Sequence, residues 1–217
     1  MIKDIITIDG PSGAGKSTVS RLLAGRLGYK YLDTGALYRA VAWKIREENT
    51  DIEDRKKIGD ILKKTKIAFN DNRVTVNGTD VTLQIRTPEI GELSSKISAR
   101  PAVRKHLFAI QRQIGLKGKV VIEGRDIGTV IFPEAKNKFF LDAGIEERAG
   151  RRHRELKKNN PETTLKAVIE GVRKRDKRDS TRQSAPLKRT ENMIYIDTSN
   201  LTMEEVVAKI MGALKSS

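Results

Sequence analysis

One stretch near the start of the chain limits the possible folds more than any other. A β-branched, apolar run, Ile5–Asp9, leads directly into a glycine-rich segment that fits G-x-x-x-x-G-K-[ST] over residues 10–17. Apolar residues then recur at helical spacing from Val19 to Leu27. A strand, a tight loop and a helix in this order predict a phosphate-binding loop.

The residue types in this loop suit a chain of phosphates. Glycines let the backbone curl so that successive N–H groups point inward, and the following helix adds unpaired donors and the positive end of its dipole. We expect Lys16 to bridge the β- and γ-phosphates of a nucleotide, and the Ser17 hydroxyl to bind Mg²⁺.

Short apolar runs recur between helical stretches along the whole chain. Besides Ile5–Asp9, we expect strands at residues 29–32, 120–122, 138–141 and 193–196. Strands of this kind favour a parallel sheet covered by helices on both faces, which is an α/β fold. The length of 217 residues suits one domain with insertions better than two domains.

Two segments depart from this alternation. Residues 67–81 hold short β-branched runs separated by Asn- and Gly-containing turns, which predicts a small antiparallel meander that is either decoration or a mobile substrate flap.

Residues 148–189 contain 15 Lys and Arg but only 5 Asp and Glu, so most of the net charge of +15 lies there. The Asn-Asn-Pro run at 159–161 predicts two helical arms around a movable tip.

Composition excludes several classes of protein. The chain has no Cys, which rules out disulfides and thiolate chemistry, and its two His residues are too scattered for a histidine metal site. No apolar run approaches the ~18 residues of a membrane span, so we expect a soluble cytoplasmic protein without a membrane partner. The excess of 43 basic over 28 acidic residues implies anionic partners such as nucleotides or nucleic acid.

Four further blocks give the loop a specific context. They read Leu-Asp-Thr-Gly-Ala-Leu-Tyr-Arg at 32–39, Ile-Arg-Thr-Pro-Glu at 85–89, Glu-Gly-Arg-Asp-Ile-Gly-Thr-Val-Ile-Phe-Pro at 123–133, and Arg-Asp-Lys-Arg-Asp-Ser-Thr-Arg at 175–182. Together with the loop, and in this order, they closely resemble bacterial cytidylate kinases over nearly the whole chain. The last two blocks are far more specific than the loop, which many unrelated NTPases share.

The resemblance implies a P-loop nucleoside monophosphate kinase fold. Such a fold has a central five-stranded parallel sheet with helices on both faces, a small antiparallel β insertion in the monophosphate-binding region, and a basic helical lid. It further implies one domain over residues 1–217, with a core at 1–62 and 95–217, an insertion at about 63–94 and a lid at about 148–165. We expect a monomer that needs no nucleic acid.

The implied activity is transfer of the γ-phosphoryl group of ATP to CMP or dCMP, giving CDP or dCDP, with Mg²⁺ bound alongside ATP. The loop residues matched to ATP binding are Gly10, Pro11, Ser12, Gly13, Ala14, Gly15, Lys16, Ser17 and Thr18. The residues matched to CMP binding are Thr34, Arg39, Ser95, Arg104, Arg125, Asp126, Arg175, Asp179 and Arg182. Those matched to catalysis are Lys16, Arg39, Arg125, Arg175 and Arg182, and Ser17 is the metal ligand.

Some positions remain open at this level. Arg148, Arg151 and Arg152 are the lid arginines, and the sequence does not say which of them reaches the phosphates. Arg178 is assigned to the surface. Asp33 is either a group near Mg²⁺ or an acid at a helix N-terminus, and Glu123 has no assigned role.

Elementary chemistry explains the choice of residues. The planar fork of arginine matches phosphate oxygens, so an arginine cluster suits an acceptor phosphate. Cytosine presents an amine donor where uracil presents a carbonyl, and the Asp126 carboxylate therefore favours cytosine, with Ser95 and Arg104 on the other base edge. The competing interpretations of Asp126 are a pair with the neighbours of Arg125 or a cap on the turn that follows it. Asp179 is the expected partner of a sugar hydroxyl.

Three other functions compete with this one. The first is a kinase for another monophosphate or for a small metabolite such as shikimate. The second is a nucleic-acid-dependent NTPase, which a pI near 10.0 favours but an aromatic content of 5% does not. The third is a GTPase switch, for which no guanine-reading Asn-Lys-x-Asp run is present.

Overall fold

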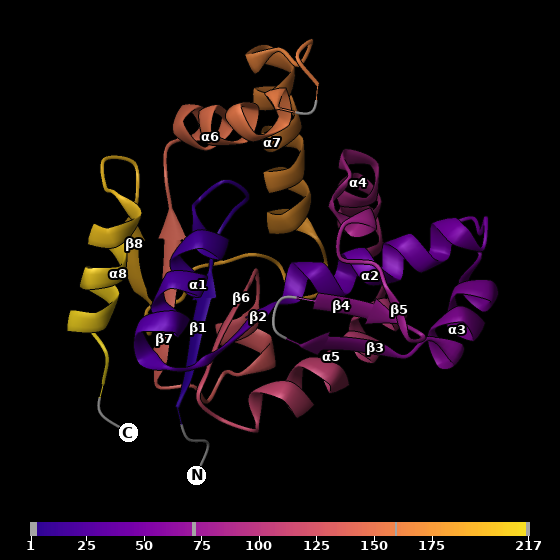
Figure 1. Ribbon diagram of the computed structural model, residues 1–217, viewed down its shortest axis with the longest axis horizontal. Helices are drawn as coiled ribbons and strands as arrows, with labels where there is room; N and C mark the ends of the chain where they lie inside the picture. Colours follow the sequence, from indigo (N-terminus) through magenta and orange to yellow (C-terminus); the bar gives the residue numbers. More distant parts are fainter. Residues whose placement is uncertain (1–3, 71–72, 159, 216–217) are drawn as a thin grey trace.

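The computed structural model of the chain describes residues 4–70, 73–158 and 160–215. A five-stranded parallel sheet in the order β2-β6-β1-β7-β8 forms its centre (Figure 1). The predicted α/β fold is therefore confirmed, and every expected strand is present with its ends shifted by at most two residues. The strands are β1 (Ile5–Asp9), β2 (Lys30–Asp33), β6 (Val120–Gly124), β7 (Asn137–Asp142) and β8 (Ile194–Asp197).

Helices cover both faces of this sheet. Side chains alternate along β6, so Val120 and Ile122 enter one apolar cluster while Val121 enters the other. Helices α1 (Lys16–Leu27) and α8 (Met203–Gly212) pack on the Val121 side. On the opposite side lie α2 (Thr34–Glu47), α3 (Arg55–Lys64), α4 (Pro88–Ile97) and α5 (Pro101–Gly115).

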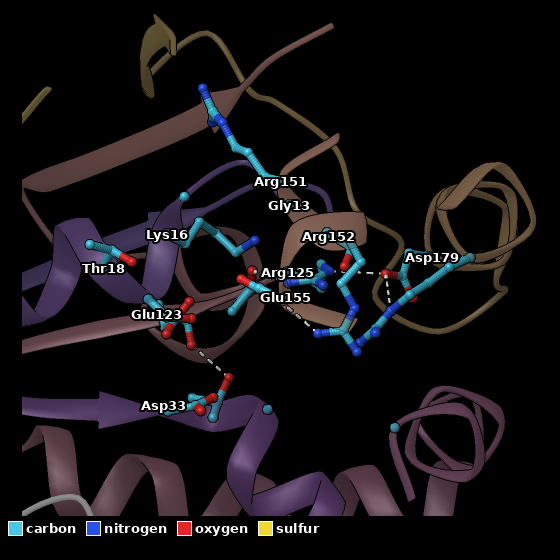
Figure 2. Close-up of a pocket in the computed structure, with 18 of the residues that line it drawn as sticks. Gly13, Lys16, Thr18, Asp33, Glu123, Arg125, Arg151, Arg152, Glu155 and Asp179 are labelled. Carbon is cyan, nitrogen blue, oxygen red and sulfur yellow. Dashed lines mark hydrogen bonds and ion pairs between the residues drawn. The ribbon is translucent and has the colours of Figure 1, made fainter. Parts of the chain in front are cut away.

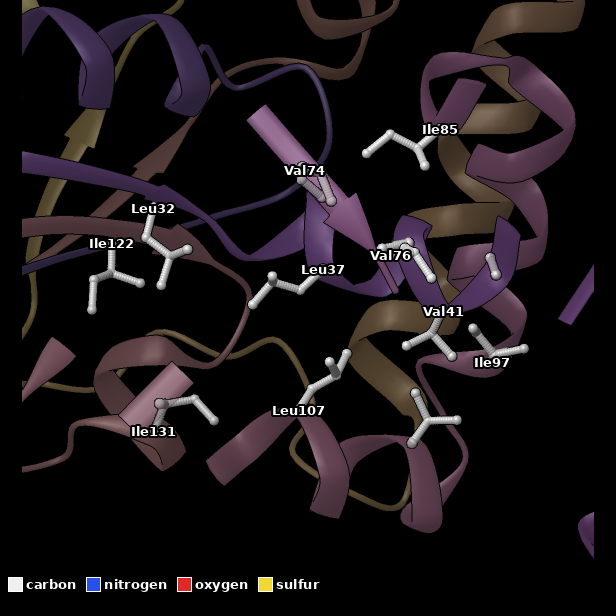
Figure 3. Packing of buried hydrophobic residues seen from close by; sticks show 14 of the residues in the cluster. Leu32, Leu37, Val41, Val74, Val76, Ile85, Ile97, Leu107, Ile122 and Ile131 are labelled. Carbon is white, nitrogen blue, oxygen red and sulfur yellow. The ribbon is translucent and has the colours of Figure 1, made fainter. Parts of the chain in front are cut away.

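The larger of the two clusters joins the sheet to the inserted segment (Figure 3). Leu37 and Val41 of α2 lie at its centre, with Leu107 of α5 on one side and Val74 and Val76 of the insertion on the other. Each of these side chains is almost completely buried, and burial of one such side chain stabilises the fold by roughly 1.5–3 kcal/mol. The insertion is thus packed on the core.

The insertion is a separate three-stranded antiparallel sheet, as the sequence predicts. Its strands are β3 (Ile67–Asn70), β4 (Arg73–Val76) and β5 (Thr79–Asp80). Asn77 and Gly78 both have positive φ, 51° and 86°, which is the backbone of a tight hairpin turn. The expected turn between the first two strands includes residues 71 and 72, which lie outside the described residues.

Two basic helices stand above the carboxyl ends of the strands (Figure 1). These are α6 (Ile145–Lys157) and α7 (Leu165–Thr181), which Ala149, Val168 and Val172 hold together in a small apolar cluster. The predicted pair of helical arms is confirmed, while the expected tip at 159–161 includes residue 159, which lies outside the described residues. The role of the arms as a lid stays a prediction.

The longest helix in the described part of the chain is α7, with 17 residues. Charged residues recur along it, because it contains the Arg-Asp-Lys-Arg-Asp block. Across residues 4–70, 73–158 and 160–215, no helix combines the length and the apolar character that a membrane crossing requires.

Candidate active site

A cavity of about 1010 Å³ opens between the loop after β1, the α6–α7 pair and α4 (Figure 2). Residues from both halves of the predicted site line it. Five predicted residues do not face it, namely Gly10, Pro11, Ala14, Arg104 and Arg148. Those that do are Ser12, Gly13, Gly15, Lys16, Ser17, Thr18, Thr34, Arg39, Ser95, Arg125, Asp126, Arg151, Arg152, Arg175, Asp179 and Arg182.

Close packing explains the glycines of the loop. Gly13 has φ +81°, and a Cβ atom there would lie 2.7 Å from the backbone oxygen of Arg148. Gly15 has φ 83° and directly precedes the first residue of α1. Any residue with a side chain is therefore strained at both positions. Gly13 and Gly15 of the loop and the first residues of α1 line the cavity, and the N-terminus of a helix favours an anion.

Lys16 is the first residue of α1 and directly follows the loop. Its side chain is buried, and Nζ donates a hydrogen bond of 2.6 Å to the backbone oxygen of Pro11. Burial, together with the nearby positive charge of Arg125, lowers the pKa of Lys16 to about 7. An anion placed here would favour the charged ammonium, because an opposite charge offsets the cost of burial.

Carboxylates lie beside Lys16 at the ends of β2 and β6 (Figure 2). Glu123 Oε1 accepts a hydrogen bond of 2.5 Å from the hydroxyl of Tyr31, and the Ser17 hydroxyl lies close enough to lower the pKa of Glu123. Burial, together with the negative charge of Asp33, raises the pKa of Glu123. Asp33 caps α2 by accepting from the backbone N–H of Ala36 at 3.0 Å, which supports its interpretation as an acid at a helix N-terminus.

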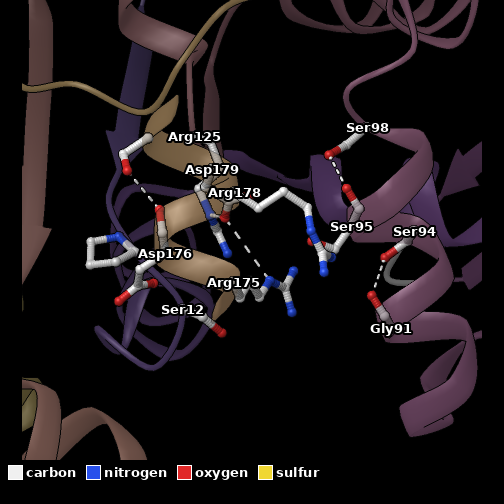
Figure 4. Close-up of polar contacts among 12 residues, drawn as sticks. Ser12, Gly91, Ser94, Ser95, Ser98, Arg125, Arg175, Asp176, Arg178 and Asp179 are labelled. Carbon is white, nitrogen blue, oxygen red and sulfur yellow. Dashed lines mark hydrogen bonds and ion pairs between the residues drawn. The ribbon is translucent and has the colours of Figure 1, made fainter. Parts of the chain in front are cut away.

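Arginines form the opposite wall, and carboxylates hold them in place (Figures 2 and 4). Arg125 Nε donates to Asp179 Oδ2 at 2.9 Å, and Arg175 Nε lies 4.0 Å from the same oxygen. Burial alone would raise the pKa of Asp179, but Arg125 and Arg175 hold it below its usual value. Arg39 Nη2 donates to Asp33 Oδ2 at 2.7 Å. Three of the arginines matched to catalysis thus line one cavity.

Asp126 lies between two buried arginines. Arg182 Nη2 donates to its Oδ1 at 3.1 Å, and Arg104 Nη2 donates to its Oδ2. Arg104 also donates to the backbone oxygen of Ser98 at 3.3 Å and does not line the cavity. The structure therefore places Arg104 behind Asp126, where it supports the carboxylate.

Arg178 is not the surface residue that the sequence suggests. Its Nη1 donates to Ser95 Oγ at 2.7 Å and its Nη2 donates to Glu92 Oε1 at 2.8 Å, which joins α7 to α4 (Figure 4). The sequence holds a signal for the direction in which Arg178 faces, since it follows Arg175 by three residues on α7, but none for its partners on α4.

The three lid arginines have different surroundings. Arg148 is buried and donates to the backbone oxygen of Ser12 at 3.1 Å and to Asp176 at 2.5 Å, so it supports the loop from behind. Arg151 lines the cavity and donates to the backbone oxygen of Thr198 at 2.7 Å. Arg152 also lines the cavity, and its side chain is 39% exposed.

Comparison with known proteins identifies the family. The profile of the cytidylate kinase family matches residues 6–216. The chain belongs to this family. Curated relatives named cytidylate kinase include one from Carboxydothermus hydrogenoformans, 50% identical over 210 residues and covering 95% of each chain. Another, from Bacillus subtilis, is 44% identical over 214 residues and covers 97% of this chain and 96% of its own. The family is one of phosphotransferase enzymes.

Solved structures share the fold at low sequence identity. An uncharacterized protein from Eubacterium ventriosum superposes with a TM-score of 0.55 at 14% identity, covering 97% of both chains. A shikimate kinase from Bacteroides thetaiotaomicron gives 0.52 at 13% identity, covering 96% of this chain and 97% of its own. These likenesses support the kinase fold alone.

Proposed function

We propose that this protein transfers the γ-phosphoryl group of ATP to CMP or dCMP, giving CDP or dCDP. One observation carries the proposal beyond family membership. A single cavity has the phosphate-binding loop with Lys16 on one side, and on the other a cluster of arginines with the buried Asp126 carboxylate. A triphosphate donor and a monophosphate acceptor with an amine-bearing base match these two sides.

The donor side is built for ATP. The loop N–H groups and the N-terminus of α1 bind the β- and γ-phosphates, and Lys16 exchanges its bond to Pro11 for phosphate oxygens. No group of three or more His, Cys, Asp or Glu in the described residues could hold a metal. The hydroxyl of Ser17 and the neighbouring Glu123 carboxylate are oxygen donors that fit Mg²⁺ carried by the nucleotide. When bound, Mg²⁺ neutralises phosphate charge.

The acceptor side positions the attacking oxygen. Arg39, Arg125, Arg175 and Arg182 surround the space where the monophosphate binds, and the first three hold its oxygens in line with the γ-phosphorus. The attacking oxygen of a monophosphate is already anionic, so no side chain has to remove a proton. Catalysis is alignment and stabilisation of charge, for which one well-placed arginine can contribute ~10³–10⁵ in rate.

The base is read by Asp126. An ionised carboxylate has about four lone-pair sites, and Arg104 and Arg182 use one on each oxygen. The exocyclic amine of cytosine can therefore bind without breaking either ion pair. Uracil presents a carbonyl oxygen at the same position, so two acceptors face each other without a hydrogen bond, which a buried site penalises strongly. Asp179 accepts from a sugar hydroxyl, and both CMP and dCMP retain the 3′-hydroxyl.

A substrate panel tests the proposal. The protein is incubated with ATP and Mg²⁺ and with CMP, dCMP, UMP, AMP or shikimate, and ADP release is followed in a coupled assay. We expect CMP and dCMP to be the preferred acceptors. Equal rates with AMP and CMP would contradict the base assignment, and a preference for shikimate would contradict the proposed substrate class.

A further inference from the structure

Asp9 is a fully buried acid that the proposed mechanism does not use. It is the last residue of β1 and directly precedes Gly10 of the loop. Its Oδ1 accepts from the backbone N–H of Ile127 at 2.9 Å, and its Oδ2 accepts from that of Gly128 at 2.8 Å. These partners lie 118 and 119 residues further along the chain.

Those two N–H groups open the π-helical turn Ile127–Ile131, for which Asp126 occupies the N-cap position. An aspartate at an N-cap ordinarily accepts from the N–H groups of the first turn itself. The side chain of Asp126 makes no such bond. Asp9 already accepts a hydrogen bond from the N–H of Gly128. The Asp126 carboxylate instead accepts hydrogen bonds from Arg104 and Arg182.

Burying the carboxylate of Asp9 costs free energy, which other interactions of the side chain must offset. Its exposed fraction is 0%, and burial raises its pKa to about 6, with Asp126 adding negative charge and Lys16 positive charge nearby. An apolar residue at this position would avoid that cost, as at Ile6 and Ile8 of the same strand. The two backbone hydrogen bonds offset it, so the carboxylate is kept where a capping acceptor is needed.

We propose that Asp9 is a positioning residue for substrate specificity: it caps the 127–131 turn from a distant strand and thereby leaves Asp126 to read the acceptor base. The inference rests on the proposed function, because it takes Asp126 as the base-reading group. It also means that the segment that starts the donor loop fixes the geometry of the acceptor site.

Asp9→Asn is the test, since it keeps the side-chain volume but replaces one acceptor oxygen with an NH₂ group that faces a backbone N–H. We expect KM for CMP to rise about tenfold, which corresponds to ~1.4 kcal/mol. Activity on UMP should change little, so the CMP:UMP ratio of kcat/KM falls by about tenfold, while KM for ATP stays within about twofold. Asp9→Ser, which keeps one acceptor, should give the same pattern.

Thr7→Val is the matched control. Thr7 precedes Asp9 by two residues on the same side of β1, is equally buried, and its hydroxyl has no hydrogen-bond partner among the described residues. It should leave the CMP:UMP ratio unchanged. The decisive step is the double-mutant cycle with Asp126→Asn: if Asp9 acts through Asp126, the effect of Asp9→Asn on the ratio disappears in that background.

Each result has one meaning. A lower CMP:UMP ratio with an unchanged KM for ATP, lost in the Asp126→Asn background, supports the inference. A parallel rise of KM for ATP and CMP, an effect that persists without Asp126, or no effect at all overturns it. Failure of the wild-type protein to phosphorylate CMP is a different result, because it contradicts the proposed function itself.

Discussion

Replacing Asp126 with Asn separates the structural and the functional roles of the buried acid. The side chain is 6% exposed, and those of its partners Arg104 and Arg182 are 8% and 4% exposed. The amide oxygen can still accept from one arginine, but the NH₂ group faces the other. Breaking a buried ion pair by removing one partner costs about 3–5 kcal/mol, so we expect a clear loss of stability in a protein that still folds.

The effect on specificity follows from the hydrogen bond that the base loses. A hydrogen bond to a charged group contributes about 1.5–3 kcal/mol. At 1.4 kcal/mol for each factor of ten, the CMP:UMP ratio of kcat/KM should fall by about 10- to 150-fold in Asp126→Asn. The fall comes mainly from a lower kcat/KM for CMP.

Steady-state rates with CMP and UMP measure the ratio, and urea unfolding measures the stability. Asp60→Asn is the control, because it makes the same chemical change at an exposed position of α3, paired with Lys63 at 3.4 Å. It should change neither quantity measurably. A destabilised Asp126→Asn protein with an unaltered CMP:UMP ratio would refute the base-reading role and leave Asp126 as a structural support for the two arginines.

Three further predictions follow from the same contacts. Lys16→Ala should lower kcat by about 10²–10³-fold while the melting temperature hardly changes; normal turnover would contradict its place at the phosphates. Arg178→Ala removes the bonds to Ser95 and Glu92 and should raise KM for CMP about 3- to 10-fold, whereas the exposed neighbour Lys177→Ala should not. For Asp9, whose pKa is raised from 3.8 to about 6, the folded state binds the proton more tightly than the unfolded state. The unfolding free energy of the wild type relative to Asp9→Asn should therefore fall by roughly 3 kcal/mol between pH 4 and 6 and level off above; a difference independent of pH would contradict this.

The sheet and its helices were predictable because their signals are local. Apolar side chains on both faces of β6, from Val120 to Ile122, are the pattern of a strand buried between two layers. The start of α8 also has a local signal, a capping box in which Thr202 and Glu205 bond each other's backbone N–H groups. The five strands needed only hydrophobic runs and the spacing between them, and small shifts at their ends reflect the fraying of element boundaries.

The site was predictable where it lies within motifs and not where distant segments meet. The loop, Arg125 and Asp126 belong to recognisable blocks, and their place in one cavity follows from the parallel sheet. The contact of Arg178 with Ser95 spans 83 residues, and that of Asp9 with Gly128 spans 119. Charge and spacing also did not indicate that the Arg148 side chain turns inward, because its partners, the backbone oxygen of Ser12 and the carboxylate of Asp176, lie 136 and 28 residues away in the sequence.

Ion pairs with carboxylates hold the arginines of this strongly basic site in fixed orientations. Arg125 uses Nε for Asp179 and Nη1 for the backbone oxygen of Gly124. A guanidinium has five N–H donors, so these two bonds fix its plane and leave donors for a phosphate. The carboxylates therefore orient the arginines in advance and reduce repulsion among them, and a monophosphate can bind without first breaking these bonds. Removing Asp179 should on this argument weaken phosphate binding even though it removes a negative charge, since the arginines lose their fixed orientation.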